Sequence, residues 1–516
     1  MLMKLFRSLF VLLVLFGVFV VVARLLLPLP DISERQDVTA TPASADTTFG
    51  RTVLAASEAF PALSGVEPIA DGTDALASRL SIIDQAEESI EVQYYIWHDD
   101  TSGILLLNAL DQAAKRGVDV RLLLDDNGVP GLDPFMAALN AQDNFEIRLF
   151  NPSTVRNPKT MGFLFDFFRM NRRMHNKSLT VDGAITIIGG RNIGDEYFEI
   201  GDEFYKDMDV LAIGSIVPEV ATTFYDYWNS NSVFELETIV SGNGDRAGFD
   251  ARVALVLASE KARAVISDVE NSAKKFAESE NILEWTTVQL VADDPIKGEG
   301  LAKRDDLMIM RLSDILGTIE KRLDLVSAYF VPSTLGTKYF TDLAKQGVDV
   351  NILTNAMNTT DVMMVHAGYT KYRRDLLEAD VDLFELKLRG GTTPGSEKQL
   401  HALGLSGASL HAKTFAVDDK RVFIGSFNFD PRSAILNCEM GFLIDSPTMA
   451  LDVSQAFDGQ FALVSYMPEL SADGRMVWKE ASATKDPKIW QQEPGTSWFK
   501  QVFLVILQTL PIEWML

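Results

Sequence analysis

The sequence HNKSLTVD at residues 175–182 recurs as HAKTFAVD at residues 411–418. In both copies a histidine and a lysine lie two positions apart, and an aspartate follows the lysine after four further residues. Six residues beyond each aspartate, the chain continues as GGRN (189–192) or GSFN (425–428). A single His-x-Lys is most often a structural or surface pair. Two copies that share the whole spacing indicate a duplicated functional site.

The residue types in this repeat suit phosphodiester chemistry. His175 and Lys177 lie two apart beside apolar residues, so on a strand both point to one face. The glycines allow the backbone to approach a ligand closely, and Asn192 and Asn428 offer amide donors to phosphate oxygens. Two copies that face each other would place two imidazoles, two ammonium groups and two amides around one anion. Such a site provides a nucleophile, an acid and fixed positive charge without a metal ion.

A second repeat shows that the duplication covers whole domains. AKRGVDV at residues 114–120 reappears as AKQGVDV at residues 344–350. Each copy ends an amphipathic helix at a C-cap glycine and leads into an apolar strand, and another β-rich run lies upstream of each helix. The order strand, helix, strand predicts parallel sheets covered by helices. We therefore expect an α/β protein with one lobe near residues 66–245 and a second near 250–470.

The paired motif resembles the HKD motif of the phospholipase D superfamily, over about residues 66–470. Residues 94–97, 166–177 and 510–513 are similar to bacterial cardiolipin synthases of the C-type branch. The resemblance implies two phospholipase D-like lobes, each a mixed, mostly parallel sheet flanked by helices, with the active site at their pseudo-twofold interface. It also implies that one histidine attacks phosphorus while the other protonates the leaving alcohol. The second histidine then deprotonates the incoming hydroxyl.

The resemblance assigns roles to individual residues. His175 and His411 become the nucleophile and the acid/base. The groups that bind phosphate oxygens would be two lysines, two asparagines and a serine: Lys177, Lys413, Asn192, Asn428 and Ser426. Asp182 and Asp418 are the motif aspartates, which we interpret as structural supports. Gly190 stands where the second copy has Ser426, so the first lobe would lack one hydroxyl contact.

In this family a carboxylate is placed against each histidine. Glu439 is the expected partner of His411 and Asp207 that of His175, while two neighbours are rivals to Asp207: Glu203 and Asp209. We expect His175 to be the nucleophile, partly because the first motif usually supplies it. Three nearby arginines would also disfavour a protonated ring: Arg169, Arg172 and Arg173. Glu439 would favour the imidazolium of His411, the form that protonates a leaving alcohol.

The composition and the spacing of a few residue types limit which partners and cofactors we expect for this chain. The formal net charge of −25 opposes a nucleic-acid partner, because binding a phosphate backbone needs a basic surface. Cys438 is the only cysteine, so the chain has no intramolecular disulfide. His98 lacks metal-ligand spacing, and Asp125-Asp126 does not match a calcium loop. We expect phospholipid substrates, no cofactor and no metal; whether an accessory protein completes the activity stays open.

The N-terminus predicts a membrane anchor over residues 1–30. Lys4 and Arg7 precede an apolar run at residues 8–23, which reaches spanning length if it continues past Arg24. No small-x-small cleavage site follows, so an uncleaved anchor is favoured over a signal peptide. The two basic residues would hold the N-terminus in the cytoplasm and place the body on the periplasmic side of the bacterial inner membrane.

Three other segments lie outside the repeat or beside it. Residues 31–65 resemble a flexible tether. The tail, residues 471–516, ends in an apolar run with tryptophans that suits either docking at a membrane interface or packing on the body. The aromatic and basic segment 161–173 has the same two interpretations.

These observations together predict phosphatidyl transfer at a membrane, with a hydroxyl of phosphatidylglycerol as acceptor and cardiolipin as product. The donor is phosphatidylethanolamine or phosphatidylglycerol, and the C-type resemblance favours phosphatidylethanolamine. Hydrolysis by water, as in phospholipase D, is the first alternative. The acidic composition and the anchor oppose a nuclease, and the two complete motifs oppose an inactive membrane scaffold.

Overall fold

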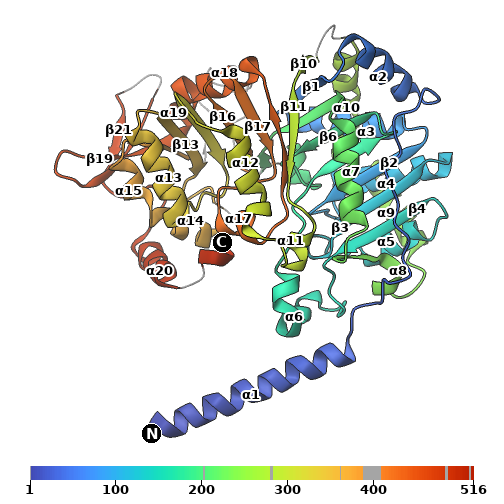
Figure 1. The fold of residues 1–516 in the computed structure, drawn as a ribbon, viewed down its shortest axis with the longest axis horizontal. Coiled ribbons are helices and arrows are strands. Elements are labelled where there is room, and N and C mark those ends of the chain that lie inside the picture. The colour runs from blue at the N-terminus through green and yellow to red at the C-terminus, as the bar shows by residue number, and fades with distance from the viewer. Residues whose placement is uncertain are drawn as a thin grey trace.

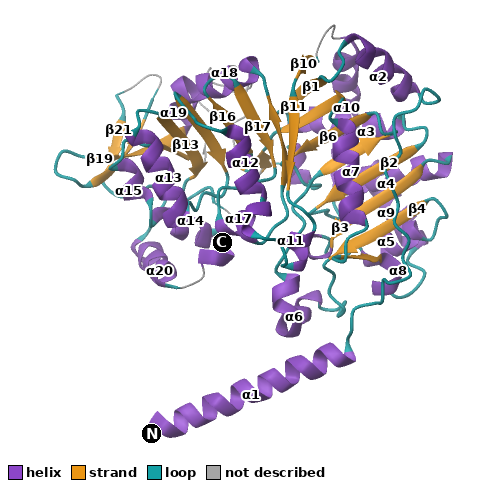
Figure 2. Cartoon of the chain, in the orientation of Figure 1, coloured by secondary structure: helices purple, strands orange, loops and turns teal. Residues whose placement is uncertain are grey.

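The computed structural model describes the chain except for Met1 and a few segments: residues 202–203, 279–282, 361, 388–407, 483–485 and 511–512. Two large β-sheets lie side by side in the body, and helix α1 (Leu2–Leu26) extends away from it (Figure 1). Figure 2 shows helices packed along both sheets. The expected α/β class with two lobes is confirmed.

Within the described residues, the first sheet has nine strands in the order β10-β1-β8-β6-β5-β2-β3-β4-β9. They are β1 (Ser64–Ile69), β2 (Ser89–Tyr94), β3 (Asp119–Asp125), β4 (Phe145–Phe150), β5 (Ser178–Val181), β6 (Ile185–Gly189), β8 (Asp209–Gly214), β9 (Val233–Glu235) and β10 (Glu284–Thr286). The helices between α1 and the second sheet are α2 (Thr48–Ala59), α3 (Gly72–Asp84), α4 (Thr101–Arg116), α5 (Asp133–Asn140), α6 (Phe163–Met170), α7 (Val217–Trp228), α8 (Leu236–Ile239), α9 (Arg246–Ala258) and α10 (Glu260–Glu278).

In the second sheet, the part of the chain that the structure describes forms ten strands in the order β11-β18-β17-β16-β12-β13-β14-β19-β20-β21. They are β11 (Val288–Ala292), β12 (Arg322–Ser327), β13 (Asp349–Asn355), β14 (Asp382–Leu386), β16 (Lys413–Val417), β17 (Arg421–Gly425), β18 (Met440–Ile444), β19 (Ser465–Leu470), β20 (Met476–Glu480) and β21 (Lys488–Trp490). Its helices are α11 (Ile296–Glu299), α12 (Met308–Leu316), α13 (Ser333–Lys345), α14 (Met363–Thr370), α15 (Arg373–Leu377), α17 (Pro431–Ile435), α18 (Pro447–Gln455), α19 (Phe461–Val464) and α20 (Trp498–Thr509).

The repeated helix–glycine–strand segment forms as expected. Asp100 caps α4 by accepting a hydrogen bond from the backbone N–H of Gly103, and α4 ends at Gly117 with φ of 102°. Gly347, after α13, has φ of 90° and leads into β13 in the same way. These left-handed positions favour glycine because a side chain there would be strained.

The sheets are less parallel than the sequence suggested. β2, β3 and β4 are parallel neighbours, as are β12, β13 and β14, but the other strand pairs of the two large sheets are antiparallel. The expectation of mostly parallel sheets is therefore wrong in this detail. In the described parts of these two sheets, the parallel neighbours belong to the strand–helix–strand units, whereas the motif strands are joined by tight turns, which permit only antiparallel pairing.

The two lobes meet through an apolar contact between their sheets. Ile188 on β6 and Val210 on β8 share one buried cluster with Ile424 on β17 and Phe442 on β18. Burial of this surface holds the motif hairpins β5–β6 and β16–β17 next to each other at the interface.

The boundaries of the lobes differ from the expected ones. β10 pairs with β1, and Phe249 of α9 belongs to the first core, so the first lobe continues past residue 250. At the other end, β20 and β21 extend the second sheet into residues that we assigned to the tail. A duplicated motif marks the centre of each lobe but carries no information on which flanking helices pack on it.

The expected tether is docked on the body. Arg35 donates hydrogen bonds to the backbone carbonyls of Val233 and Asn229, and the backbone of Val38 bonds the side chain of Asn229. Helix α2 occupies much of the remaining segment. The interpretation of residues 31–65 as a free tether is therefore wrong, because backbone carbonyls of the body provide partners that composition does not reveal.

Candidate active site

Each HKD motif forms a tight hairpin. β5 and β6 are joined by Asp182-Gly183 and β16 and β17 by Asp418-Asp419, and these four residues have positive φ, as in a type I′ turn. The carboxylate of Asp182 accepts hydrogen bonds from the backbone N–H groups of residues 87–89, and that of Asp418 from those of residues 320–322. Both motif aspartates thus fasten their hairpin to the start of the neighbouring strand.

The histidines of the two motifs each pair with a carboxylate of the opposite lobe. Nδ1 of His175 lies 2.8 Å from Oε2 of Glu439, and Nδ1 of His411 lies 2.5 Å from Oδ2 of Asp207. All four side chains are buried. The sequence-based pairing of His175 with Asp207 and of His411 with Glu439 is therefore wrong, although the four residues were the expected ones.

The path of the backbone explains why each histidine pairs with a carboxylate of the opposite lobe. The residue before His175 forms a β-bridge with the residue before Glu439. Likewise, strand β15 (Ala408–Leu410) ends one residue before His411, strand β7 (Phe204–Lys206) ends one residue before Asp207, and these two strands pair. Each motif therefore enters its hairpin from a short β-pairing with the other lobe, a single bridge in the first motif and a ladder in the second, and this pairing brings the carboxylate to the histidine.

Asp209, one of the two rivals to Asp207, contacts no histidine in the part of the chain that the structure describes. Asp209 forms buried ion pairs with Arg79, at 2.8 Å, and Arg191, at 3.2 Å. Glu203 lies outside the described residues.

The two motif lysines are buried beside the histidines. Nζ of Lys177 donates a 2.6 Å hydrogen bond to the carbonyl of His175, and Nζ of Lys413 donates to the carbonyl of His411. Burial lowers the pKa of Lys177 to about 7, although the charge of Glu439 opposes this shift. An anionic phosphate bound there would favour the charged ammonium. The lysines are therefore suited to hold an anion between the lobes.

The two histidines differ in their electrostatic surroundings. Burial and then the charges of Lys177, Lys413 and His411 lower the pKa of His175 well below its ordinary value. Burial and Lys413 also lower the pKa of His411, but Asp207 opposes that shift. The pKa values of the two partner carboxylates also differ. Burial raises the pKa of Glu439, whereas the charges of His411 and Lys413 overcome burial and hold that of Asp207 below its usual range. His411 therefore keeps a proton more readily than His175.

The three arginines before His175 are not the reason for this difference. Arg173 pairs with Asp125 at 2.9 Å, and Arg169 pairs with Asp166 at 2.5 Å, so both charges are largely compensated. The lowered pKa of His175 comes instead from burial and from the site's own cations. The expectation of a neutral His175 ring still holds, but burial and the cations of the site cause it, not the arginines.

Asn192 keeps an amide donor for a ligand. Oδ1 of Asn192 accepts a hydrogen bond from the backbone N–H of Ile96, at 3.3 Å, and Oδ1 of Asn428 accepts one from Tyr329, at 3.4 Å. The Nδ2 of Asn192 is buried and has no hydrogen-bond partner among the described residues. A buried donor without a partner is costly, so a phosphate oxygen at this position would stabilise it.

Ser426 has a different contact from the expected one. Its hydroxyl donates a 2.5 Å hydrogen bond to Oε2 of Glu439, the same oxygen that pairs with His175. Ser426 is therefore placed to orient the carboxylate, and its assignment as a phosphate-binding group is wrong. In the first lobe, a Cβ at Gly190 would meet Oδ1 of Asp207 at 2.1 Å. The shorter aspartate fills the place that serine occupies in the second lobe.

Aromatic rings beside the histidines were not identified as site residues from the sequence. Tyr95 packs edge-on against His175 with ring centroids 5.1 Å apart, and Tyr197 does so against His411, also at 5.1 Å. Tyr205 lies 5.4 Å from His411. A signal was present only for Tyr95, which belongs to the stretch similar to cardiolipin synthases.

Other residues that stand out in the sequence make contacts outside the two histidine–carboxylate pairs. Asp125 accepts hydrogen bonds from Arg173 and from the backbone N–H of Met174, and so supports the segment before His175. His366 is buried against Glu493 at 2.7 Å. His98, Asp100 and Glu196 form a partly exposed group whose ligand atoms lie within 4.8 Å of one another. The sequence spacing of His98 did not indicate this group, because Glu196 belongs to a short 3-10 helix (Asp195–Phe198) that is distant in the sequence.

Comparison with known proteins identifies the family. The family model described as "Cardiolipin synthase, PLD-like domain" matches residues 80–215 and 312–461, more than half of the chain, and each stretch contains one motif. Cardiolipin synthase C of Escherichia coli is 43% identical over 471 residues, which cover 90% of this chain and 98% of that protein. The chain belongs to the cardiolipin synthase family of the phospholipase D superfamily. The resemblance inferred from the paired motifs is thereby confirmed.

More distant relatives agree with this assignment. The major cardiolipin synthase of Bacillus subtilis is 27% identical, over 76% of this chain and 68% of that protein. The crystal structure of a phosphatidylserine synthase from Haemophilus influenzae shares the fold, with a TM-score of 0.52 at 13% identity, and the match covers 90% of this chain and 99% of that one. The two-lobed arrangement is thus a property of the wider fold, whereas the sequence identity places this chain among cardiolipin synthases.

Proposed function

We propose that this protein is a phosphatidyltransferase that moves a phosphatidyl group to a hydroxyl of phosphatidylglycerol and so forms cardiolipin. The observation that carries the proposal is the pair of buried imidazoles, each bound through Nδ1 to a carboxylate of the opposite lobe. Membership in the cardiolipin synthase family supports the substrate class.

In the first half-reaction, His175 is the nucleophile. Because its Nδ1 is bound to Glu439, it presents Nε2 to the phosphorus of the donor lipid. Attack forms an N–P bond and breaks the P–O bond to the headgroup alcohol, whose oxygen takes the Nε2 proton of His411. The ammonium groups of Lys177 and Lys413 stabilise the charge on the non-bridging oxygens.

In the second half-reaction the roles of His411 reverse. Its neutral ring takes the proton of a phosphatidylglycerol hydroxyl, and the resulting oxygen attacks phosphorus. The N–P bond breaks, which releases neutral His175 and cardiolipin and leaves His411 protonated for the next cycle. Asp207 stabilises the imidazolium that His411 forms in each cycle.

The burial of the site favours transfer over hydrolysis. His175 and His411 are each 7% exposed, and Lys177 is 1% exposed. A site that excludes bulk water gives a bound lipid hydroxyl an advantage over water as the acceptor. We propose phosphatidylethanolamine as the donor, on the basis of the C-type resemblance, with phosphatidylglycerol as the alternative.

We also propose that α1 anchors the protein in the bacterial inner membrane with the body on the periplasmic side. Met3–Leu26 is long and apolar enough to cross a bilayer, and Arg24 pairs with Asp166 of α6 at 2.9 Å. In Figure 1, α6 and α20 lie at the end of the body that faces α1. Both carry exposed apolar side chains, such as Phe168, Trp498 and Phe499. Leu504 packs α20 against α14, so this helix docks on the body and keeps an apolar face for lipid.

The activity is tested in vesicles of phosphatidylethanolamine and phosphatidylglycerol with the purified full-length protein. We expect labelled cardiolipin to form and ethanolamine to be released. His175→Ala and His411→Ala should each lose at least about 10²–10⁴-fold in rate, whereas His98→Ala, outside the site, should stay within about twofold. Phosphatidic acid as the dominant product would favour the hydrolase, and release of glycerol in place of ethanolamine would identify phosphatidylglycerol as the donor.

The anchor is tested by fractionation of a chain that lacks residues 1–30. We expect this variant to be released from membranes more readily than the full chain. Exchange of Trp498 and Phe499 for serine should release it further, because those side chains are 64% and 68% exposed and available to lipid. If the combined variant still pelleted fully with membranes, neither segment would be the principal anchor.

A further inference from the structure

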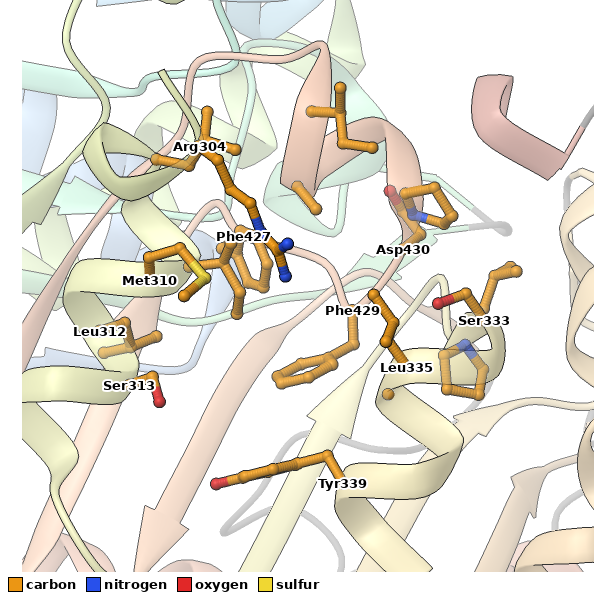
Figure 3. A pocket seen from close by; sticks show the side chains of 18 of the residues that line it. Arg304, Met310, Leu312, Ser313, Ser333, Leu335, Tyr339, Phe427, Phe429 and Asp430 are labelled. Atoms are coloured by element: carbon orange, nitrogen blue, oxygen red, sulfur yellow. The ribbon is translucent and has the colours of Figure 1, made fainter. Parts of the chain in front are cut away.

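The second lobe contains an apolar cavity of about 820 Å³ that includes none of the motif histidines, lysines or asparagines (Figure 3). It lies between α12, the start of α13 and the segment that leads into α17. Its lining is largely aliphatic and aromatic, including Leu312, Leu323, Phe415, Phe427, Phe429 and Tyr339. A cavity of this size and character is within the range of sites that bind organic ligands.

The cavity shares a wall with the active site. Ser426 bonds Glu439, the partner of His175, while the next residue, Phe427, lines the cavity. Phe429 lines it as well, and Asn428, the expected phosphate-binding residue, lies between the two rings in sequence. A ligand in the cavity would therefore lie against the segment that carries Asn428.

The rim of the cavity leaves apolar surface uncovered. Leu335 is 71% exposed, Ile435 is 54% exposed and Tyr339 is 40% exposed, and all three line the cavity. An apolar hollow with an apolar rim is unfavourable in water and marks a binding site for an apolar molecule.

Basic residues also line this cavity, although the chain as a whole is acidic. Arg304 extends into it from the segment before α12 (Figure 3). Its guanidinium makes no hydrogen bond or ion pair with any residue in the described ranges, and Arg172 of the first lobe lines the same cavity. Asp430 is a buried acid in the lining, and burial raises its pKa to about 7, so part of its negative charge is removed. The site thus combines an apolar interior with an available cation.

We propose that this cavity binds one acyl chain of phosphatidylglycerol, with the lipid phosphate at Arg304. The apolar interior matches the hydrocarbon chain, and the guanidinium matches the phosphodiester. This inference rests on the proposed function, since it makes the cavity the place where a lipid substrate is held beside Asn428. It adds a binding site, and a lipid charge preference, that the catalytic motifs do not provide.

The test is photolabelling of the full-length protein in detergent with phosphatidylglycerol that carries a diazirine in one acyl chain. We expect the label on peptides that contain α12, the start of α13 or residues 427–435. Ser313→Trp, which places a large side chain in the cavity, should lower this labelling at least about fivefold. Asp314→Trp, on the neighbouring position of α12 but outside the cavity lining, should leave it within about twofold.

A charge variant tests the role of Arg304. Arg304→Gln should lower labelling by the phosphatidylglycerol probe severalfold more than labelling by a phosphatidylcholine probe of the same chain length. Label that is located elsewhere, or equal labelling of Ser313→Trp and Asp314→Trp, would contradict the proposal that the cavity binds the acyl chain. Equal effects of Arg304→Gln on both probes would overturn the headgroup contact.

The same probe separates this inference from the proposed activity. His175→Ala should retain the labelling, because it blocks turnover and leaves the cavity intact. Labelling in a wild-type protein that makes no cardiolipin would contradict the proposed function alone. Cardiolipin synthesis that proceeds without labelling of the cavity would contradict the cavity alone.

Discussion

Nδ1 of His175 in the first lobe lies 2.8 Å from Oε2 of Glu439 in the second lobe, and the hydroxyl of Ser426 donates a hydrogen bond to the same oxygen. His411 and Asp207 form the reciprocal pair across the interface. Neither lobe therefore contains a complete active site. The two histidines are oriented only when the lobes are assembled, which links the fold of the whole body to the chemistry.

The crossed pairing predicts how single carboxylate variants shift the histidine pKa values. Asp207 raises the pKa of His411, so Asp207→Asn should lower it, while the pKa of His175 changes little. Hydrogen–deuterium exchange at the imidazole C2 position, read peptide by peptide, measures each histidine separately. A shift confined to His175 in Asp207→Asn would restore the pairing expected from the sequence.

The lowered histidine pKa values also predict the pH dependence of stability. An unfolded histidine has a pKa of about 6.5. Below that pH the histidine of the unfolded chain binds a proton, whereas buried His175 in the folded protein stays neutral because its pKa is lower. The free energy of unfolding should therefore fall by about 1.4 kcal/mol for each pH unit below 6.5 and for each such group. Above that pH the contribution is fully present.

His175→Gln isolates this effect. The difference in unfolding free energy between this variant and wild type should change between pH 6.5 and 5. Buried acids with raised pKa values, such as Glu91, change the stability with pH in the opposite sense, but they are present in both proteins and cancel in this difference. Denaturant unfolding at several pH values measures it. A difference that stays constant over this range would mean that His175 titrates normally in the folded protein.

Chelation should leave the activity intact. Lys177 and Lys413 supply positive charge at the site, so we expect the rate in excess EDTA to equal that without it. Asp125 and Asp126, the acidic pair noted in the sequence, are occupied by Arg173 and by Arg156. Loss of activity in EDTA, with recovery on addition of a divalent ion, would point to the group His98, Asp100 and Glu196.

Much of the site could be predicted because its information is local. The turn at Asp182 depends only on its own residue types, but β5 begins at Ser178, so His175 and Lys177 lie just before that strand and not on it as expected. The partner of each histidine could not be predicted, because it depends on contacts between segments some 264 positions apart. Ser426 shows the same limit: its hydroxyl is fixed by the motif, but only the position of Glu439 decides whether it faces phosphate or carboxylate.

Locating the covalent intermediate is the most direct test of the two histidine roles. We expect a slowly transferred phosphatidyl donor to label His175, because its ring is held neutral while Asp207 favours the imidazolium of His411. The full-length protein is incubated with this donor, digested under non-acidic conditions and mapped by mass spectrometry, with His175→Ala as the control. Label on the His175 peptide that disappears in His175→Ala is the predicted result. Label on the His411 peptide, with none on His175, would contradict the account and exchange the two roles.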